Sequence, residues 1–520
     1  MSTQAGGDRQ ASPVSPEPSK SSAQPPTDDA PLGALESGLK PRHVTMISIA
    51  GVIGAGLFVG SANAIQLAGP SAIISYAAAG LVVVLVMRML GEMATVNPDT
   101  GSFSVYADRA LGKWAGFSIG WLYWWAWALI IPVEATAGAT ILHNWIDWPQ
   151  WVFAFLITAI LTATNLVSVG NYGEFEFWFA LVKVVIIIGF IALGVLAILG
   201  ILPTSDVSGV HGLTDHGFFG GGVGGIFAAM LTTTTTYLGT EIVTIAAAES
   251  NNPVGGIRKA VNSVIWRISI FYLGSIMVVV CLVDWTSPDL ASKGSYQYTL
   301  ETIGLGRLTT VLDLAILTAV ASCLNSALYT ASRMAFSLGQ RGDAPKSFGR
   351  TNKRGVPVAA ILASVVVGFF CVALNYVLPD KIFAYLLSTA GCAALFVYLC
   401  ISFTQLRSRR AMDEAGTTVR VRMWLFPWLT YATIAFILLI LVMMAFDDGQ
   451  SQNLWFSLAV AAIVLVAAFA RHGFTGGSDE EIVEAAEQGL AEHDDPDVPD
   501  DPDDADDTTA TSTEAHRNDA

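Results

Sequence analysis

Long apolar stretches recur along most of the chain, and they constrain its fold more than any other feature. A helix needs about 20 apolar residues to cross the hydrocarbon core of a bilayer. Twelve such stretches occur, at 44–66, 71–95, 115–142, 150–170, 176–201, 225–248, 263–283, 309–336, 357–378, 381–406, 423–446 and 452–470. They lack the alternating pattern of barrel strands, and a helix satisfies its own backbone in lipid. The sequence therefore predicts an all-α membrane protein with 12 transmembrane helices.

The composition supports a membrane protein. Hydrophobic residues make up 53% of the chain and charged residues 13%, against about 25% charged in a soluble domain. The net charge of −16 comes from residues 479–520, which hold 17 of the 43 acidic residues and one basic residue. Because the rest of the chain is neutral, nucleic acid is not expected as a partner, whereas the lipid bilayer is.

Three regions follow from this distribution. Residues 1–39 are rich in Pro, Ser and Gln and lack an apolar run, which predicts a disordered cytoplasmic tail and no cleaved signal peptide. Residues 40–472 form the membrane domain. Residues 473–520 are expected to be an acidic disordered cytoplasmic tail, although the pattern around 480–490 is compatible with a short amphipathic helix.

The distribution of basic residues predicts the orientation. The loops on one side of the membrane contain only Lys293, Arg307 and Lys381, while most other Lys and Arg residues fall on the side of the two tails. Basic loops stay in the cytoplasm. We therefore expect a multi-pass protein of the cell membrane with both termini cytoplasmic.

Motifs of nucleotide binding and hydrolysis are missing. The Gly112-Lys113 pair is followed by Trp114 where a phosphate-binding loop needs Ser or Thr. The five cysteines lie singly in apolar runs, which argues against disulfides and zinc sites. The sequence predicts a secondary transporter without enzyme activity, cofactor or metal.

The first apolar stretch contains a cluster of glycines, Gly51-Val-Ile-Gly54-Ala-Gly56-Leu-Phe-Val-Gly60. Each glycine weakens a helix by about 1 kcal/mol relative to Ala. If the helix breaks here, its freed N–H groups and half-helix dipole can bind a carboxylate without a cation. Close packing of helices is the alternative explanation of the small residues.

The sixth stretch has a matching irregularity, Thr235-Thr236-Tyr237-Leu238-Gly239-Thr240-Glu241. The first and sixth helices occupy corresponding places in a five-plus-five inverted repeat, and paired interruptions there indicate a transport site. Carbonyls exposed by the break can accept hydrogen bonds from an ammonium group. A zwitterion would then fit between the two breaks.

Three ionisable residues in the spans are candidates for coupling or gating. Lys183 is either a proton carrier or a permanently charged lysine bonded to carbonyls of the first helix. Glu241 and Glu134 are candidates for gating or hydrogen bonding, with a structural role as the alternative for each. Asn325 and Ser326 either reach the site or join helices.

Other charged residues of the spans are expected near the cytoplasmic helix ends, where long side chains reach water or form pairs: Arg88, Glu92, Arg267 and Arg333.

Taken together, these motifs resemble the amino acid–polyamine–organocation superfamily, and within it the bacterial amino acid transporters. The likeness covers nearly all of residues 40–445 and is most specific in five segments, 39–60, 98–106, 171–178, 241–250 and 322–333. Within that branch the segments are most similar to the 4-aminobutyrate (GABA) permeases.

This resemblance implies a LeuT-like fold, with the first and sixth helices interrupted, and proton-coupled uptake. It implies that Gly54, Ala55 and Gly56 hold the substrate carboxylate while Gly239 and Thr240 receive the amine. Ile53 and Tyr237 flank these two groups as further substrate-binding candidates. Lys183 matches a lysine of the fifth helix that is implicated in proton coupling.

One departure concerns the segment before Gly239. The family commonly has Phe-x-Phe where this chain has Thr235-Thr236-Tyr237, so an aromatic gate is either missing or supplied elsewhere.

We expect proton symport of GABA or a close analogue. The alternatives are a permease or exchanger for another small amino acid, such as β-alanine, proline or asparagine, and a membrane sensor that binds the same ligand. The sequence carries no prediction of oligomeric state.

Overall fold

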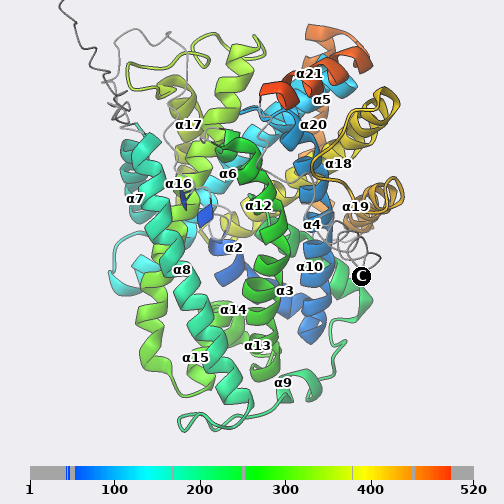
Figure 1. The fold of residues 1–520 in the computed structure, drawn as a ribbon. Coiled ribbons are helices and arrows are strands. Elements are labelled where there is room, and N and C mark those ends of the chain that lie inside the picture. Colours follow the sequence, from blue (N-terminus) through cyan, green and yellow to red (C-terminus); the bar gives the residue numbers. More distant parts are fainter. Residues whose placement is uncertain are drawn as a thin grey trace, which may run out of the picture.

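The structure is a computed structural model that describes residues 42–43, 45–46, 53–166, 169–248, 252–377, 379–446 and 451–492. Every regular element in these ranges is helical (Figure 1). The first half comprises α2 (Ala55–Phe58), α3 (Gly60–Ala68), α4 (Ala72–Val96), α5 (Phe103–Leu111), α6 (Lys113–Trp145), α7 (Gln150–Asn165), α8 (Val169–Ile198), α9 (His211–Thr214), α10 (Gly222–Thr236) and α11 (Ile242–Ala248). The second half comprises α12 (Pro253–Arg267), α13 (Ser275–Leu282), α14 (Pro288–Lys293), α15 (Ser295–Thr302), α16 (Thr309–Gln340), α17 (Val358–Val377), α18 (Pro379–Ala415), α19 (Trp428–Phe446), α20 (Ser451–His472) and α21 (Asp479–Glu492).

The apolar stretches form the long helices. Within the described ranges, eight helices are long and apolar enough to cross a membrane, and two shorter apolar ones are Gln150–Asn165 and Val358–Ala373. The first of the eight, Ala55–Val96, contains parts of the first two predicted stretches, and the sixth stretch is divided between α10 and α11. An all-helical protein with several apolar spans is therefore confirmed, whereas the number twelve stays a prediction.

The centre of the bundle is built around α6. This helix packs against α7, α16 and α18 and is the most buried of the apolar helices, while α8 and α20 are mostly exposed. The exposed positions of α8 and α20 carry large apolar side chains, including Trp178, Val185, Ile463 and Val466. Such an apolar exterior suits lipid as the surrounding solvent.

Two helices are interrupted where the sequence predicts breaks. Gly54 is extended before α2, and Val59 separates α2 from α3. A turn at 237–241 separates α10 from α11. Gly51, which belongs to the same glycine cluster, lies outside the described residues.

The two interruptions adjoin each other. Thr236 Oγ1 donates to the Gly56 carbonyl at 3.3 Å, and a Cβ on Gly56 would lie 3.2 Å from Thr236 Cα. The absence of a side chain at Gly56 thus favours the close approach of α10 to α2. The structure places the two predicted half-sites side by side.

At one end of the molecule, α21 lies beside α5 (Figure 1) and packs on α4, α5 and α18. Ile482 and Ala486 of α21 contribute to an apolar cluster with Val96 and Met412. This helix falls in residues 473–520, for which we expect disorder, and it matches the amphipathic pattern noted at 480–490. Helical structure therefore continues to residue 492, whereas residues 493–520 and the predicted tail 1–39 lie outside the described ranges.

Candidate functional site

The break in the first helix exposes a backbone N–H group, and a buried carboxylate binds it. Ala55 N–H donates to both oxygens of Glu134, at 3.2 and 3.1 Å. Glu134 projects from α6 and is 3% exposed. A Cβ on Gly54 would lie 2.4 Å from Glu134 Oε1 and 2.8 Å from Cys323 Cβ, so glycine is required here. The N–H predicted to hold a substrate carboxylate is thus held by Glu134 in this structure.

The break in the sixth helix has the same arrangement. Gly239 adopts φ +104°, a conformation that favours glycine, and its N–H donates to both oxygens of Glu241 at 3.1 Å. Tyr398 of α18 also donates to Glu241, at 3.4 Å. The Thr240 hydroxyl donates to the Tyr237 carbonyl at 2.8 Å, which tightens the turn. Each break is therefore capped by a buried glutamate.

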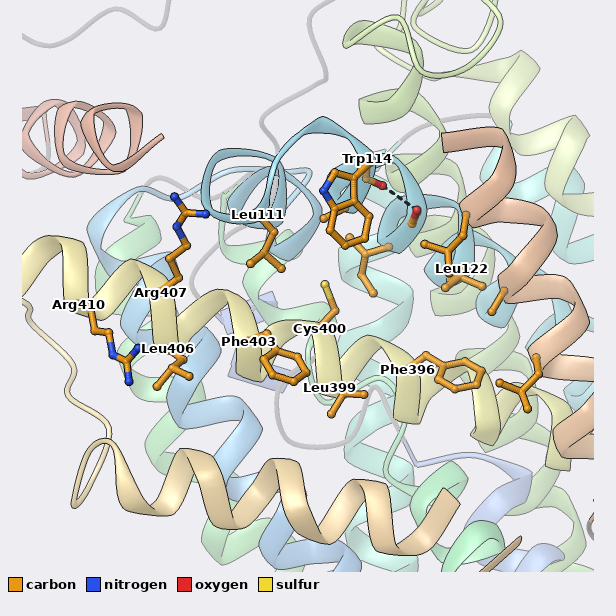
Figure 2. A pocket seen from close by; sticks show the side chains of 16 residues that line it. Leu111, Trp114, Leu122, Phe396, Leu399, Cys400, Phe403, Leu406, Arg407 and Arg410 are labelled. Carbon is orange, nitrogen blue, oxygen red and sulfur yellow. Dashed lines mark hydrogen bonds between the residues drawn. The ribbon is translucent and has the colours of Figure 1, made fainter. Parts of the chain in front are cut away.

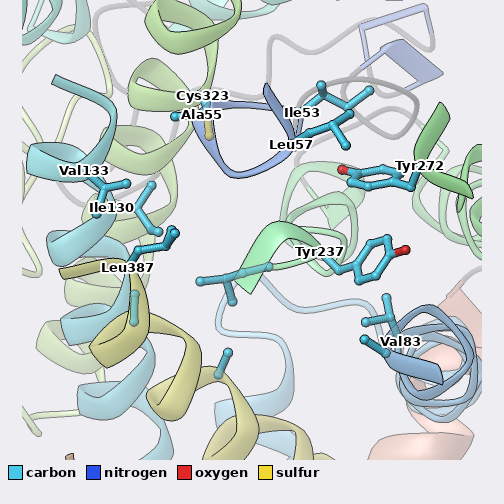
Figure 3. Packing of buried hydrophobic residues seen from close by; sticks show 14 of the residues in the cluster. Ile53, Ala55, Leu57, Val83, Ile130, Val133, Tyr237, Tyr272, Cys323 and Leu387 are labelled. Carbon is cyan, nitrogen blue, oxygen red and sulfur yellow. The ribbon is translucent and has the colours of Figure 1, made fainter. Parts of the chain in front are cut away.

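The side chains of the other two substrate-binding candidates, Ile53 and Tyr237, lie in different surroundings. Ile53 is fully buried and lies beside Leu57, at the first break. The Tyr237 side chain points away from Ala55 and Cys323, toward Val83 (Figure 3). Its hydroxyl donates to the Tyr76 carbonyl at 3.0 Å. The structure thus places the backbone of Tyr237 at the turn and its ring in the packing against α4.

Lys183 lies in a buried polar network that includes a residue the sequence analysis missed. Lys183 Nζ donates to Ser322 Oγ at 2.7 Å, and Ser322 Oγ donates to Glu176 Oε1 at 2.6 Å. The Lys183 and Glu176 charges are 3.9 Å apart, with both side chains fully buried. Glu176 precedes Lys183 by seven residues, two helical turns on the same face, and that spacing is visible in the sequence.

Helix α16 connects this network to its neighbours. Ser322 contacts Lys183 and Glu176 of α8, while Asn165 of α7 donates to Asn325 Oδ1 at 2.6 Å. Cys323 lies against the Gly54 position and the Glu134 carboxylate. The Asn325 contact thus joins α16 to α7, which is one of the two roles considered for it.

The arginine expected near a helix end is deeper than predicted. Helix α12 begins at Pro253, ten residues before the predicted start, so Arg267 lies about 21 Å along the helix at 1.5 Å per residue. Its side chain is 3% exposed. It therefore does not reach water.

An apolar groove away from the helix breaks is a poor site for a zwitterion. A cavity of about 660 Å³ lies between α6, α18 and α20 and is lined mainly by apolar side chains such as Trp114, Phe396 and Phe403 (Figure 2). Its two arginines already have partners, since Arg407 bonds to the Gly477 carbonyl and Asp479 while Arg410 bonds to Tyr431. The helix breaks remain the better candidate site.

Residues 43–475 match the family model described as amino acid permease. The chain belongs to the amino acid permease family.

Several curated members of this family are closely similar to the chain. A probable GABA permease of Pseudomonas aeruginosa is 56% identical over 416 residues, which cover 79% of this chain and 87% of that protein. The gamma-aminobutyric acid permease of Escherichia coli is 52% identical, over 84% of this chain and 95% of that protein. The Bacillus subtilis protein of the same name is 47% identical, over 83% and 92%.

Solved structures share the fold at low sequence identity. A manganese transporter of Eremococcus coleocola superposes with a TM-score of 0.51 at 13% identity, covering 88% of this permease and 95% of that chain. A nucleobase-cation-symport-1 family transporter in a closed conformation gives 0.50 at 15% identity, covering 88% and 100%. These likenesses place the permease in a transporter fold and indicate nothing about its substrate.

Proposed function

We propose that this permease imports GABA, or a close analogue, across the cell membrane by proton symport. The observation that carries the proposal is the adjacency of the two interrupted helices at Gly56 and Thr236. The similarity to three relatives named as GABA permeases supports the choice of substrate. In this proposal the permease has twelve spans, a five-plus-five inverted repeat and both termini in the cytoplasm.

The substrate would bind between the breaks. The amides of Gly54, Ala55 and Gly56, beside Ile53, would hold its carboxylate. The turn with Tyr237, Gly239 and Thr240 would receive its amine through backbone carbonyls. Since Glu134 accepts from Ala55 N–H here, a substrate carboxylate can take that position only when the Glu134 carboxylate withdraws. Glu134 would therefore couple substrate loading to a movement of α6 against α2.

Proton coupling would use the buried Lys183 network. Ser322 bridges Lys183 and Glu176, so a proton can move between these groups without crossing lipid. A buried lysine beside a carboxylate stays charged more easily than an isolated one. Loss of the Glu176 carboxylate would therefore change how proton movement through Lys183 is coupled to uptake. This makes Glu176 the partner of Lys183 in the proposed mechanism.

Uptake of GABA into proteoliposomes under an imposed inward proton gradient tests the proposal. We expect accumulation by the wild type, its loss in Lys183→Ala, and a reduced rate in Glu176→Gln. Equal accumulation by all three proteins would contradict the proton role and leave the substrate standing. Uptake of β-alanine, proline or asparagine in place of GABA would contradict the substrate, and uptake that depends on an internal amino acid would indicate exchange.

A further inference from the structure

The terminal nitrogens of a buried arginine near the second break lack a hydrogen-bond partner among the described residues. Arg267 is the last residue of α12 and precedes the π-helical turn Ile268–Gly274. Its Nη1 and Nη2 atoms are buried and have no hydrogen-bond partner among the described residues, nor does it form an ion pair with any of them. A buried charge of this kind is strongly unfavourable unless acceptors compensate it. The guanidinium therefore requires an acceptor that these side chains do not supply.

The surroundings of Arg267 belong to the turn at 237–241. The ionisable groups that act electrostatically on its charge are Tyr272, Glu241 and Tyr398. Glu241 lies in the turn itself, and the Tyr272 ring lies 4.6 Å from the ring of Tyr237. Figure 3 shows Tyr272 beside Tyr237, on the side of Leu57. Helix α12 also packs against α11, which begins just after the turn. Arg267 thus lies near the space where the substrate is proposed to bind.

None of the buried glutamates among the described residues accepts a hydrogen bond from Arg267. Glu241 is held by the Gly239 N–H and the Tyr398 hydroxyl. The three other buried glutamates among the described residues also accept from other donors: Glu92 from Gln405, Arg409 and Met423, Glu134 from Ala55, and Glu176 from Ser322. The missing acceptor must therefore come from outside the described chain or from a rearrangement of Glu241.

The chemistry of the side chain selects the ligand. A guanidinium presents a planar fork of donors that matches a carboxylate in a bidentate arrangement. The transported molecule of an amino acid permease carries a carboxylate. We propose that Arg267 binds the substrate carboxylate beside the turn at 237–241 in a second bound pose, distinct from the one in which the amides of the first break hold the carboxylate and the turn receives the amine. This proposal rests on the proposed function.

Substitution of Arg267 tests the proposal, with Arg88→Gln as the matched control. Arg88 lies on the neighbouring α4, has partners in the Arg422 carbonyl and Asn262, and loses the same charge. For Arg267→Gln we expect the KM of GABA uptake to rise at least about tenfold and the GABA-induced rise in Tm to disappear. Arg267→Lys keeps the charge without the fork and should lie between Gln and wild type. Arg88→Gln should keep both readouts within about twofold of wild type.

Three results would overturn the proposal. One is an unchanged KM and thermal shift in Arg267→Gln. A second is recovery of uptake in the double variant Glu241→Gln/Arg267→Gln relative to both single variants, which would assign Arg267 to pairing with Glu241. The third is failure of both Arg267 variants to fold, which would assign the residue to stability. If the wild type transports another amino acid and not GABA, the Arg267 and Arg88 variants are measured with that amino acid. The proposal of GABA as substrate and the proposal that Arg267 binds the carboxylate can therefore fail separately.

Discussion

At the scale of single residues, Gly54 offers the sharpest test of the first break. A Cβ at this position would collide with Glu134 and Cys323, and both neighbours are buried. We expect Gly54→Ala to lower the free energy of unfolding by about 1–3 kcal/mol, the usual cost of overpacking. GABA uptake should fall strongly because the added methyl group lies at the amides proposed to hold the substrate carboxylate and disturbs the Glu134 contact proposed to couple loading to movement of α6. Thermal unfolding in detergent and uptake in proteoliposomes measure the two effects.

Gly189→Ala is the matched control for this residue. Gly189 lies within α8, and a Cβ there would meet no atom within 4 Å. Alanine in a helix is more stable than glycine by about 0.5–1 kcal/mol, so this variant should be neutral or slightly stabilised. Equal behaviour of the two variants would contradict the role given to Gly54.

The glycine pattern predicted the break in the first helix. The position of Glu134 against that break depends on how α6 packs, and the glycine segment alone carries no information about this packing.

At the scale of elements, α21 is expected to stabilise one end of the bundle. Ile482 is buried against α4 and α18, and Asp479 pairs with Arg407 at 3.2 Å. A chain ending at residue 478 should lose about 1.5–3 kcal/mol of stability, since burial of one large apolar side chain contributes that much. A chain ending at residue 492 keeps α21 and should unfold like the full protein. Thermal unfolding of the two truncated chains measures the difference.

Uptake by the same truncated chains separates a transporter from a sensor. The main contacts of α21 are with α4, α5 and α18 and not with the interrupted helices α2, α10 and α11, so both chains should keep GABA uptake. Loss of uptake in the chain ending at 478 alone would show that α21 acts on transport.

The acidic composition of the segment 473–520 predicted disorder because it lacks apolar runs. Helix α21 forms because Ile482 and Ala486, four residues apart, share one face that packs on the membrane domain.

At the scale of the whole molecule, the sequence predicted the helical class and both breaks. It predicted twelve spans, whereas eight helices of the described residues are long and apolar enough to cross a membrane. Hydropathy measures continuous apolar length, whereas transport helices are interrupted for function. Helices α10 and α11 are therefore each too short to count as spans although they share one predicted stretch. Pairings between distant segments, such as Glu176 with Ser322, depend on tertiary packing and have no local signal.

The orientation of the whole molecule can be tested with single cysteines. Ser292 lies in α14, on the side predicted to be external, and Lys353 lies in the loop between α16 and α17, on the side predicted to be cytoplasmic; both are exposed. Four of the five native cysteines are buried and Cys400 is partly buried, so background labelling should be low. A membrane-impermeant maleimide should label Ser292→Cys in intact cells and Lys353→Cys only in inside-out vesicles. The reverse pattern would contradict cytoplasmic termini, and labelling of both residues from one side would contradict the predicted number of crossings between them.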